Sequence, residues 1–139
     1  PQMKFTRDLI IRFEHCDAAG LIFYPRFFGL VNETVEDWFA SLGHSFKSLH
    51  IDDRKGVPTV RFECEFVGPV RIGDMLHQQL GVDSIGASSL SLKHIARIGE
   101  RTVARFDQTI VFTDLASMKA EPWPADLRTA ITKFAELPQ

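Results

Sequence analysis

The chain of 139 residues is poor in the features that mark several large classes of protein. It has only two cysteines, Cys16 and Cys64, which are too few for a disulfide-stapled secreted domain and suit a reducing cytoplasm. No apolar run approaches the roughly 20 residues that span a bilayer. The N-terminal PQMKFTRDLI also has no apolar stretch of the kind found in signal peptides. We therefore expect a cytoplasmic protein with no membrane partner.

An excess of positive charge is also missing. Lysine and arginine together number 16 and aspartate and glutamate 18, which gives a formal net charge of −2. Proteins that bind nucleic acid normally carry a basic excess, so we expect no nucleic-acid partner. Hydrophobic residues at 45% and charged residues at 24% are ordinary for a globular protein. The length fits a single domain, residues 1–139, with a core of its own.

The most hydrophobic segment of the chain predicts one long helix, residues 25–43. Its apolar residues recur at steps of three or four, which places them on one face of a helix. They are Phe27, Phe28, Leu30, Val31, Val35, Trp38, Phe39 and Leu42. Pro25 suits the first helical position, because its missing N–H would have no intrahelical partner there, and Gly43 suits the end.

The remaining periodic segments predict strands. Residues of high strand propensity, or apolar and polar residues in alternation, occupy five segments. These are residues 6–14, 57–67, 75–83, 88–98 and 101–112. Gly99-Glu100 fits a two-residue hairpin turn. Residues 44–56 are expected to form a polar loop with some helix, and residues 125–137 a short helix. Strands in a run favour an α+β fold whose antiparallel sheet wraps the long helix.

A charged residue, Asp17, stands in a loop before the long helix, in the stretch FEHCDAAGLIFYPRFF (13–28). Pro25 at the helix start leaves nearby N–H groups without partners, and the N–H of Tyr24 is a free donor beside them. With the helix dipole they favour negative charge, including a developing oxyanion. Gly20 allows the loop to bring in a carboxylate, which can attack a carbonyl carbon or take a proton from water. Alternatively, Asp17 is a turn residue or an anion that stabilises the helix N-terminus.

The same stretch resembles the 4-hydroxybenzoyl-CoA thioesterase family of hotdog-fold enzymes. The resemblance rests on the pattern C-D-x-A-G-x-x-x-Y-P (16–25) and on FVGPVRIGDML (66–76), which resembles the family's link between its second and third strands. It implies a hotdog fold, in which a curved antiparallel sheet of about five strands wraps a central helix. It also implies a homodimer or homotetramer, with the thioester at the dimer interface and coenzyme A reaching the surface.

The resemblance also assigns roles by position. The family's catalytic carboxylate falls on Asp17, and the backbone N–H that polarises the thioester carbonyl falls on Tyr24. Gly20 and Pro25 belong to the same motif, and together with His15 they are expected to contact the substrate. His15 stands where the close hydroxybenzoyl enzyme has an acid.

The chain departs from that enzyme at two further places. Asn32 stands where the enzyme has an aspartate, and the uncharged IGAS (85–88) falls where it offers basic residues to the nucleotide. The expected substrate is therefore an aromatic or medium-chain acyl-CoA. The sequence does not identify its acyl group or the residues that contact its nucleotide. An acyl carrier protein in place of coenzyme A also stays open.

Other chemistries are disfavoured. His15, Cys16 and Asp17 are metal-ligand types, but consecutive residues rarely close a tetrahedral site and no second cluster completes one, so we expect no metal and no cofactor. Cys16 as a nucleophile would need a histidine base, and packing is its expected role. His94 lies on the apolar face of its strand and is expected to be a core or interface histidine.

Two other functions are kept as alternatives to an acyl-CoA thioesterase. A hotdog module could bind acyl-CoA without hydrolysing it, but the retained Asp17 argues against this. A hotdog dehydratase or hydratase usually needs a histidine paired with a carboxylate on the central helix, and the predicted helix has no histidine before His44. The sequence therefore predicts a thioester hydrolase.

Overall fold

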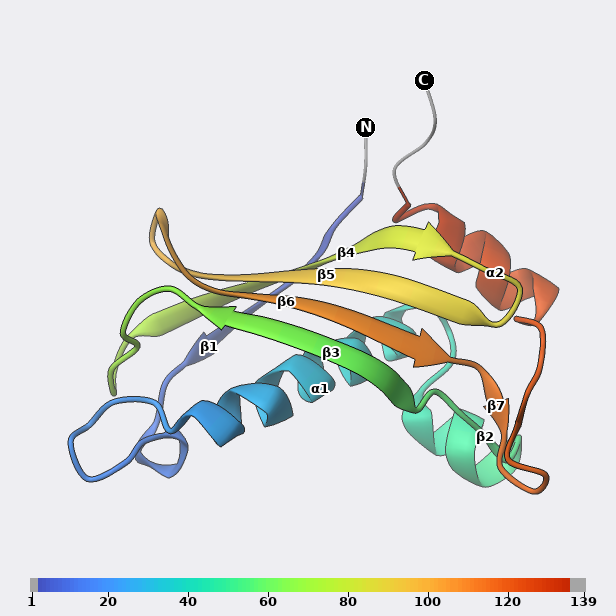
Figure 1. Ribbon diagram of the computed structural model, residues 1–139, viewed down its shortest axis with the longest axis horizontal. Helices are drawn as coiled ribbons and strands as arrows, with labels where there is room; N and C mark the ends of the chain where they lie inside the picture. Colours follow the sequence, from blue (N-terminus) through green and yellow to red (C-terminus); the bar gives the residue numbers. More distant parts are fainter. Residues whose placement is uncertain (1–2, 136–139) are drawn as a thin grey trace.

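A computed structural model describes residues 3–135 and shows a large antiparallel sheet against a long helix (Figure 1). The sheet order is β1-β4-β5-β6-β3. Its strands are β1 (Phe5–Ile10), β3 (Thr59–Phe66), β4 (Met75–Ile85), β5 (Ser89–Ile98) and β6 (Arg101–Val111). The helix α1 (Tyr24–Ser41) runs along one face of the sheet (Figure 1). The predicted α+β arrangement of five antiparallel strands around one helix is confirmed. In residues 3–135, no helix is long and apolar enough to cross a membrane.

The helix packs on the sheet through the face that the sequence predicts. Its buried residues are Phe27, Leu30, Val31, Thr34, Val35, Trp38 and Phe39. Phe28, expected in the same stripe, lies at its border with 36% of its surface exposed. Thr34 is tolerated in the core because its hydroxyl donates to the carbonyl of Leu30 at 2.9 Å.

The core divides into two clusters along α1. The cluster at the N-terminal end includes Ile11, Phe27, Leu30, Val31, Val70, Leu76 and Phe106. The cluster at the C-terminal end includes Trp38, Phe39, Leu49, Trp123, Leu127 and Ile131, the last two from α2 (Ala125–Thr132). The first cluster therefore supports the helix terminus next to Asp17.

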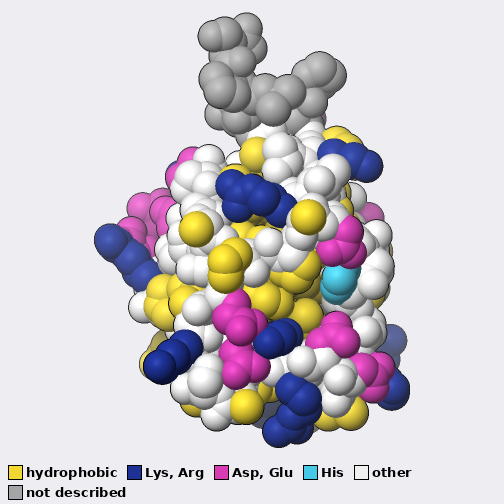
Figure 2. All heavy atoms as spheres, turned by 90° about the vertical axis from the view of Figure 1, so that its right-hand side faces the viewer, with side chains coloured by type: hydrophobic (Ala, Val, Ile, Leu, Met, Phe, Trp, Pro, Cys, Tyr) yellow, Lys and Arg dark blue, Asp and Glu magenta, His cyan; other side chains and the backbone are white. Residues whose placement is uncertain are grey.

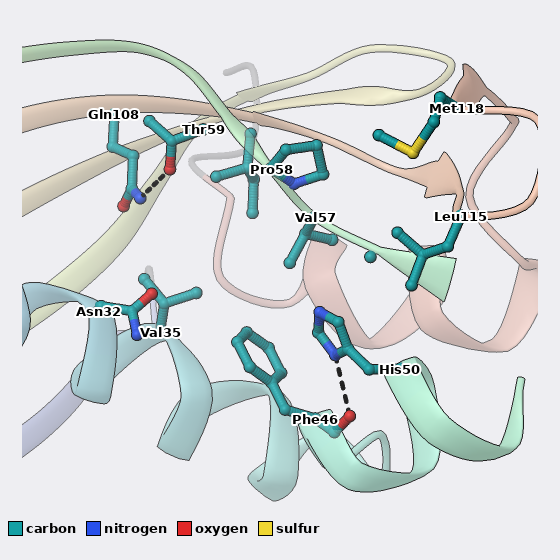
Figure 3. A pocket seen from close by; sticks show the side chains of 12 residues that line it. Asn32, Val35, Phe46, His50, Val57, Pro58, Thr59, Gln108, Leu115 and Met118 are labelled. Atoms are coloured by element: carbon teal, nitrogen blue, oxygen red, sulfur yellow. Dashed lines mark hydrogen bonds between the residues drawn. The ribbon is translucent and has the colours of Figure 1, made fainter. Parts of the chain in front are cut away.

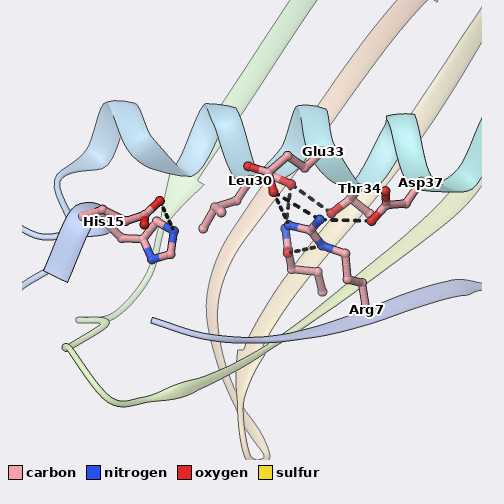
Figure 4. Close-up of polar contacts among 8 residues, drawn as sticks. Arg7, His15, Leu30, Glu33, Thr34 and Asp37 are labelled. Carbon is pink, nitrogen blue, oxygen red and sulfur yellow. Dashed lines mark hydrogen bonds and ion pairs between the residues drawn. The ribbon is translucent and has the colours of Figure 1, made fainter. Parts of the chain in front are cut away.

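Strand β1 is shorter than the predicted segment 6–14. It ends at Ile10 and is followed by a 3-10 turn, η1 (Phe13–His15). Arg7 on β1 holds the strand to α1, because its guanidinium lies 3.3 Å from Glu33 and 3.1 Å from Asp37 (Figure 4). At the other end of the chain, α2 ends before the predicted residue 137, and residues 136–137 lie outside the described residues.

Short elements gather at one end of the molecule. The π-helical turn η2 (Ser48–Asp52) is the helical part expected within residues 44–56. The sequence does not predict the small second sheet, in which β2 (Lys55–Gly56) joins β7 (Thr113–Asp114) and β8 (Lys119–Ala120). The ammonium of Lys55 contacts Asp114 at 3.0 Å and Glu121 at 2.6 Å, which fixes this sheet. Hydrophobic side chains occupy the middle of this end, among charged side chains of both signs (Figure 2).

Strand β3 forms an exposed edge of the main sheet. The strand predicted for residues 57–67 forms over Thr59–Phe66 with a bulge between Thr59 and Arg61, and its predicted apolar face is poorly covered: Val60 is 63% exposed and Phe66 is 45% exposed. Within residues 3–135, β3 pairs only with β6, so its outer edge carries backbone groups available for another strand.

Candidate active site

Residues 15–24 fold into a tight loop that leads into α1. The two sides of the loop pair like a small hairpin: the N–H of Asp17 donates to the carbonyl of Leu21 at 2.9 Å, and the N–H of Phe23 donates to the carbonyl of His15 at 2.9 Å. The loop therefore joins Asp17 to the helix start through a short hydrogen-bonded ladder.

The Asp17 side chain stabilises this turn with one oxygen. Its Oδ1 accepts hydrogen bonds from the N–H groups of Ala19 at 2.9 Å and Leu21 at 3.3 Å. Gly20 reverses the chain with a φ of +77°, which glycine adopts most readily. Asp17 is exposed, and its Oδ2 has no hydrogen-bond partner within residues 3–135. The turn role is thus present, and a free carboxylate oxygen remains for chemistry.

The second motif of the resemblance lies against the first. The N–H of Ile22 donates to the carbonyl of Val70 at 2.8 Å, and the N–H of Ile72 donates to the carbonyl of Gly20 at 2.9 Å. The link between β3 and β4 therefore supports the Asp17 loop through two backbone hydrogen bonds.

The helix terminus offers the donor that the sequence predicts. Helix α1 begins at Tyr24, one residue earlier than predicted, so Pro25 takes the second helical position, and no side chain caps the terminus. The N–H of Arg26 donates to the carbonyl of Phe23 at 2.8 Å, whereas the N–H of Tyr24 has no acceptor in the described part of the chain. This free N–H and the helix dipole together favour negative charge.

An apolar pocket of about 490 Å³ opens beside this terminus. It is lined by Leu21, Ile22, Tyr24, Phe27, Phe66, Gly68, Pro69 and Val70. Its walls thus come from the Asp17 loop, the first turns of α1, and the end of β3 with the segment that follows it. A pocket of this size and character suits an apolar ligand group. Sequence reasoning misses most of this lining, because no spacing pattern connects the three segments.

His15, expected to contact the substrate, is almost buried with 8% of its surface exposed. Its Nδ1 accepts a hydrogen bond from the N–H of Arg12 at 2.9 Å. Its Nε2 lies 3.8 Å from a carboxylate oxygen of Glu14. The ring therefore stabilises the η1 turn. The predicted contacts of His15, Gly20 and Pro25 with the substrate stay a prediction.

Cys16 has the electrostatic surroundings of an unreactive thiol. Partial burial, followed by the negative charges of Asp17 and Asp74, raises the pKa of the Cys16 thiol. A raised pKa disfavours the thiolate, which is the nucleophilic form. Residues 3–135 contain no group of three or more His, Cys, Asp or Glu side chains placed to hold a metal ion.

A curved sheet around one helix, with an uncapped helix start beside a loop carboxylate, defines the class of this molecule as a hotdog-fold protein. The chain belongs to the thioesterase-like superfamily, whose sequence profile matches residues 11–131. This membership confirms the predicted fold.

Individual proteins similar to this chain are named for aromatic CoA thioesters. The 1,4-dihydroxy-2-naphthoyl-CoA hydrolase of Nostoc punctiforme is 24% identical over 125 residues, which cover 90% of this chain and 84% of that protein. The structure of a 1,4-dihydroxy-2-naphthoyl-CoA thioesterase from Synechocystis has a TM-score of 0.85 at 23% identity, covering 94% of this chain and 96% of that chain. A gentisyl-coenzyme A thioesterase structure has a TM-score of 0.81 at 25% identity, covering 91% and 98%.

These comparisons confirm the predicted enzyme class, a thioester hydrolase. The resemblance to the 4-hydroxybenzoyl-CoA thioesterase family is confirmed only at the level of the superfamily.

Proposed function

We propose that this chain hydrolyses an aromatic acyl-CoA, such as a hydroxybenzoyl-CoA, to the free acid and coenzyme A. The observation that carries the proposal is the free N–H of Tyr24 beside the apolar pocket of about 490 Å³. An anion-favouring donor next to an apolar pocket suits a thioester, whose carbonyl gains charge while its acyl group stays apolar. The aromatic CoA thioesters named for similar proteins support the substrate class.

The Tyr24 N–H acts as the oxyanion donor in this mechanism. The thioester carbonyl oxygen accepts its hydrogen bond, and negative charge grows on that oxygen as the tetrahedral intermediate forms. The contact strengthens in the transition state, which is the condition for catalysis. Loss of one such donor typically costs about 2.7–4 kcal/mol of transition-state stabilisation.

Asp17 supplies the second function through its unpartnered Oδ2. As a nucleophile, it attacks the carbonyl carbon, the C–S bond breaks, the coenzyme A thiolate leaves, and water then hydrolyses the aspartyl anhydride. As a general base, it takes a proton from water while that water attacks the carbonyl carbon directly. We favour the nucleophilic route slightly, because the helix terminus would hold the carbonyl within reach of the loop carboxylate.

A single turnover in ¹⁸O-labelled water separates these two routes. If Asp17 is the nucleophile, water attacks the anhydride at the enzyme's own carbon, so label enters the Asp17 carboxylate and the product of the first turnover is unlabelled. If Asp17 is a general base, label enters the product acid directly.

A second copy of the chain would complete the site, as a homodimer or as half of a homotetramer. Strand β3 leaves its outer edge unpaired, and Val60 on it is 63% exposed. Tyr24, beside the apolar pocket, is 59% exposed. Pairing β3 with its copy would give the unpaired backbone groups of the strand edge hydrogen-bond partners and would cover these side chains. A long exposed edge would otherwise promote aggregation. We place this enzyme in the cytoplasm, where Cys16 and Cys64, both free, stay reduced.

A hydrolysis screen tests the proposed function. Aromatic, short, medium and long acyl-CoAs are offered to the purified protein, and released thiol is detected. We expect the highest kcat/KM for an aromatic acyl-CoA. Hydrolysis of aliphatic acyl-CoAs alone would contradict the substrate class. Binding of acyl-CoA with no release of thiol would favour the non-catalytic module instead.

A further inference from the structure

His15 joins the turn before Asp17 to the start of α1 through both its ring and its backbone. The ring accepts the N–H of Arg12 on Nδ1 at 2.9 Å, and the N–H of His15 donates to the carbonyl of Arg12 at 3.0 Å. On the other side, the carbonyl of His15 accepts the N–H of Phe23, the residue that precedes α1, at 2.9 Å. Residue 15 is therefore held by the η1 turn and holds the helix start in turn.

The contact with Arg12 fixes the state of the His15 ring. A backbone N–H can only donate, so Nδ1 carries no hydrogen, and the hydrogen of the neutral ring is on Nε2. That nitrogen lies 3.8 Å from a carboxylate oxygen of Glu14, which is too long for a direct hydrogen bond. Arg12 is the N-cap of η1 and His15 its third residue, which is the spacing at which a side chain returns a hydrogen bond to the cap. Without the ring nitrogen, the N–H of Arg12 would lose this partner.

Two other hydrogen-bonded histidines belong to distant parts of the fold. A cavity of about 280 Å³ between α1, η2 and the start of β3 has four polar side chains in its lining (Figure 3): Asn32, His50, Thr59 and Gln108. The His50 ring points into this cavity, and its Nδ1 lies 2.9 Å from the carbonyl of Phe46, to which it donates. The Nε2 of the buried His94 on β5 lies 2.9 Å from Oε1 of Gln108, which can only accept. Both rings thus donate to an oxygen, whereas His15 accepts a backbone N–H in the segment that carries Asp17.

The carbonyl of residue 15 determines which donor the helix start presents. It occupies the N–H of Phe23, and the carbonyl of Phe23 occupies the N–H of Arg26 at 2.8 Å. The N–H of Tyr24, between these two in sequence, has no acceptor within residues 3–135. A shift of residue 15 would release the N–H of Phe23 and move the neighbouring N–H of Tyr24 with it.

The same backbone pair carries the catalytic carboxylate. Asp17 follows His15 by two residues, and Tyr24 follows Phe23 by one. The His15–Phe23 hydrogen bond is therefore the base from which both the carboxylate and the oxyanion donor extend. A misplacement of about 1 Å at such groups can cost about 10²-fold in rate, so the rigidity of this base matters for catalysis.

We propose that the His15 ring is a positioning residue for the hydrolysis. By accepting the N–H of Arg12, it fixes the carbonyl of residue 15 and thereby the position of Phe23. Through this pair it holds the distance between the Asp17 carboxylate and the Tyr24 N–H, and this role needs no contact between the ring and the substrate. The inference rests on the proposed function, which gives those two groups their parts in the reaction.

Two substitutions of His15 separate the ring nitrogen from the volume of the ring. His15→Leu fills the space with no acceptor, whereas in His15→Asn the side-chain oxygen can take the place of Nδ1. On the best acyl-CoA of the hydrolysis screen, we expect His15→Leu to lower kcat by about tenfold or more and to leave KM within about twofold. His15→Asn should retain kcat within about threefold of the wild type, because the acceptor is restored.

The matched control is His44→Leu. It removes a ring whose Nε2 lies 2.9 Å from the Asp126 carboxylate, near the other end of α1, and it should retain the wild-type kcat. A coupling test uses Asp17→Asn. Because the ring acts through Asp17, adding His15→Leu to Asp17→Asn should lower kcat by a clearly smaller factor than in the wild type. A merely structural loss, such as a smaller folded fraction, would multiply with the effect of Asp17→Asn.

The state of the ring is measured without any substrate, which keeps the inference testable if His15→Leu fails to fold. ¹⁵N NMR of the imidazole in the full-length wild type should show the hydrogen of the neutral His15 ring on Nε2 and none on Nδ1. A hydrogen on Nδ1 would remove the contact with Arg12 and overturn the inference.

Three kinetic results would also overturn it. A wild-type kcat in His15→Leu would remove the positioning role and leave the thioesterase intact. A raised KM at unchanged kcat in both variants would make His15 a substrate contact instead. Absence of thiol release from every acyl-CoA would remove the proposed function, and the catalytic role of His15 with it.

Discussion

Replacing His94 should change how the stability of the fold depends on pH. Burial, opposed by the Gln108 hydrogen bond and by Asp107, lowers the pKa of His94 from 6.5 to about 4. Between these two pH values the unfolded chain binds a proton that the folded chain excludes. The stabilisation from His94 is therefore complete above about pH 6.5 and is lost as the pH falls towards 4. From these two pKa values, the free energy of unfolding should fall by about 2 kcal/mol between pH 7.5 and pH 5.

Urea unfolding of the wild type and His94→Gln at one fixed protein concentration measures this effect. Glutamine can still donate to Gln108 but cannot titrate, so the variant should lose less stability than the wild type over the same interval. Asp114 does not interfere, because the Ser117 N–H and then Lys55 lower the pKa of its carboxyl below 3.8. If the free energy of unfolding fell equally in the two proteins between pH 7.5 and pH 5, a neutral, buried His94 would be refuted.

The site and the assembly allow three further predictions. Tyr24→Phe should keep most activity, because the proposed donor is the backbone N–H; a loss as large as that of Asp17→Asn, measured as kcat on an aromatic acyl-CoA, would assign the chemistry to the phenol. Cys16→Ala should also keep kcat, since the raised pKa of its thiol disfavours a nucleophilic role, and a loss of more than about tenfold would contradict this. Sedimentation at low micromolar concentration should show a dimer, and Val60→Lys should increase the monomer fraction by placing a charge on the exposed β3 edge; a stable wild-type monomer would count against the shared site.

The periodic part of the fold could be predicted from the sequence because burial imposes the period. The spacing of Phe27, Val31, Val35 and Trp38 follows from one helix face meeting the sheet, and these residues are buried. The strand alternation in residues 57–67 was equally clear, but it could not show that Val60 lies on an edge. Exposure there depends on which strands pair, and pairing is a property of the whole sheet.

Short elements, and sites whose residues are scattered along the chain, could not be predicted from the sequence for a different reason. Strand β2, of two residues, is too short to show any period, and it exists only because β7 pairs with it. Asp17 and the start of α1 could be found because a local motif joins them. The cavity between Asn32, Thr59 and Gln108 draws on segments far apart in the chain, and the partner of His94 had no sequence signal.

The turnover of Asp17→Asn on the best aromatic acyl-CoA tests the central claim most directly. The change removes the charge but keeps the shape, so the thioester should still bind. Asp83→Asn, at an exposed position on β4, is the matched control and should retain full activity. We expect kcat to fall by about 10²–10⁴ if Asp17 is a general base, and almost completely if it is the nucleophile. A variant that keeps more than about a tenth of the wild-type kcat would fall short of even the general-base expectation and reduce Asp17 to the residue that closes its turn.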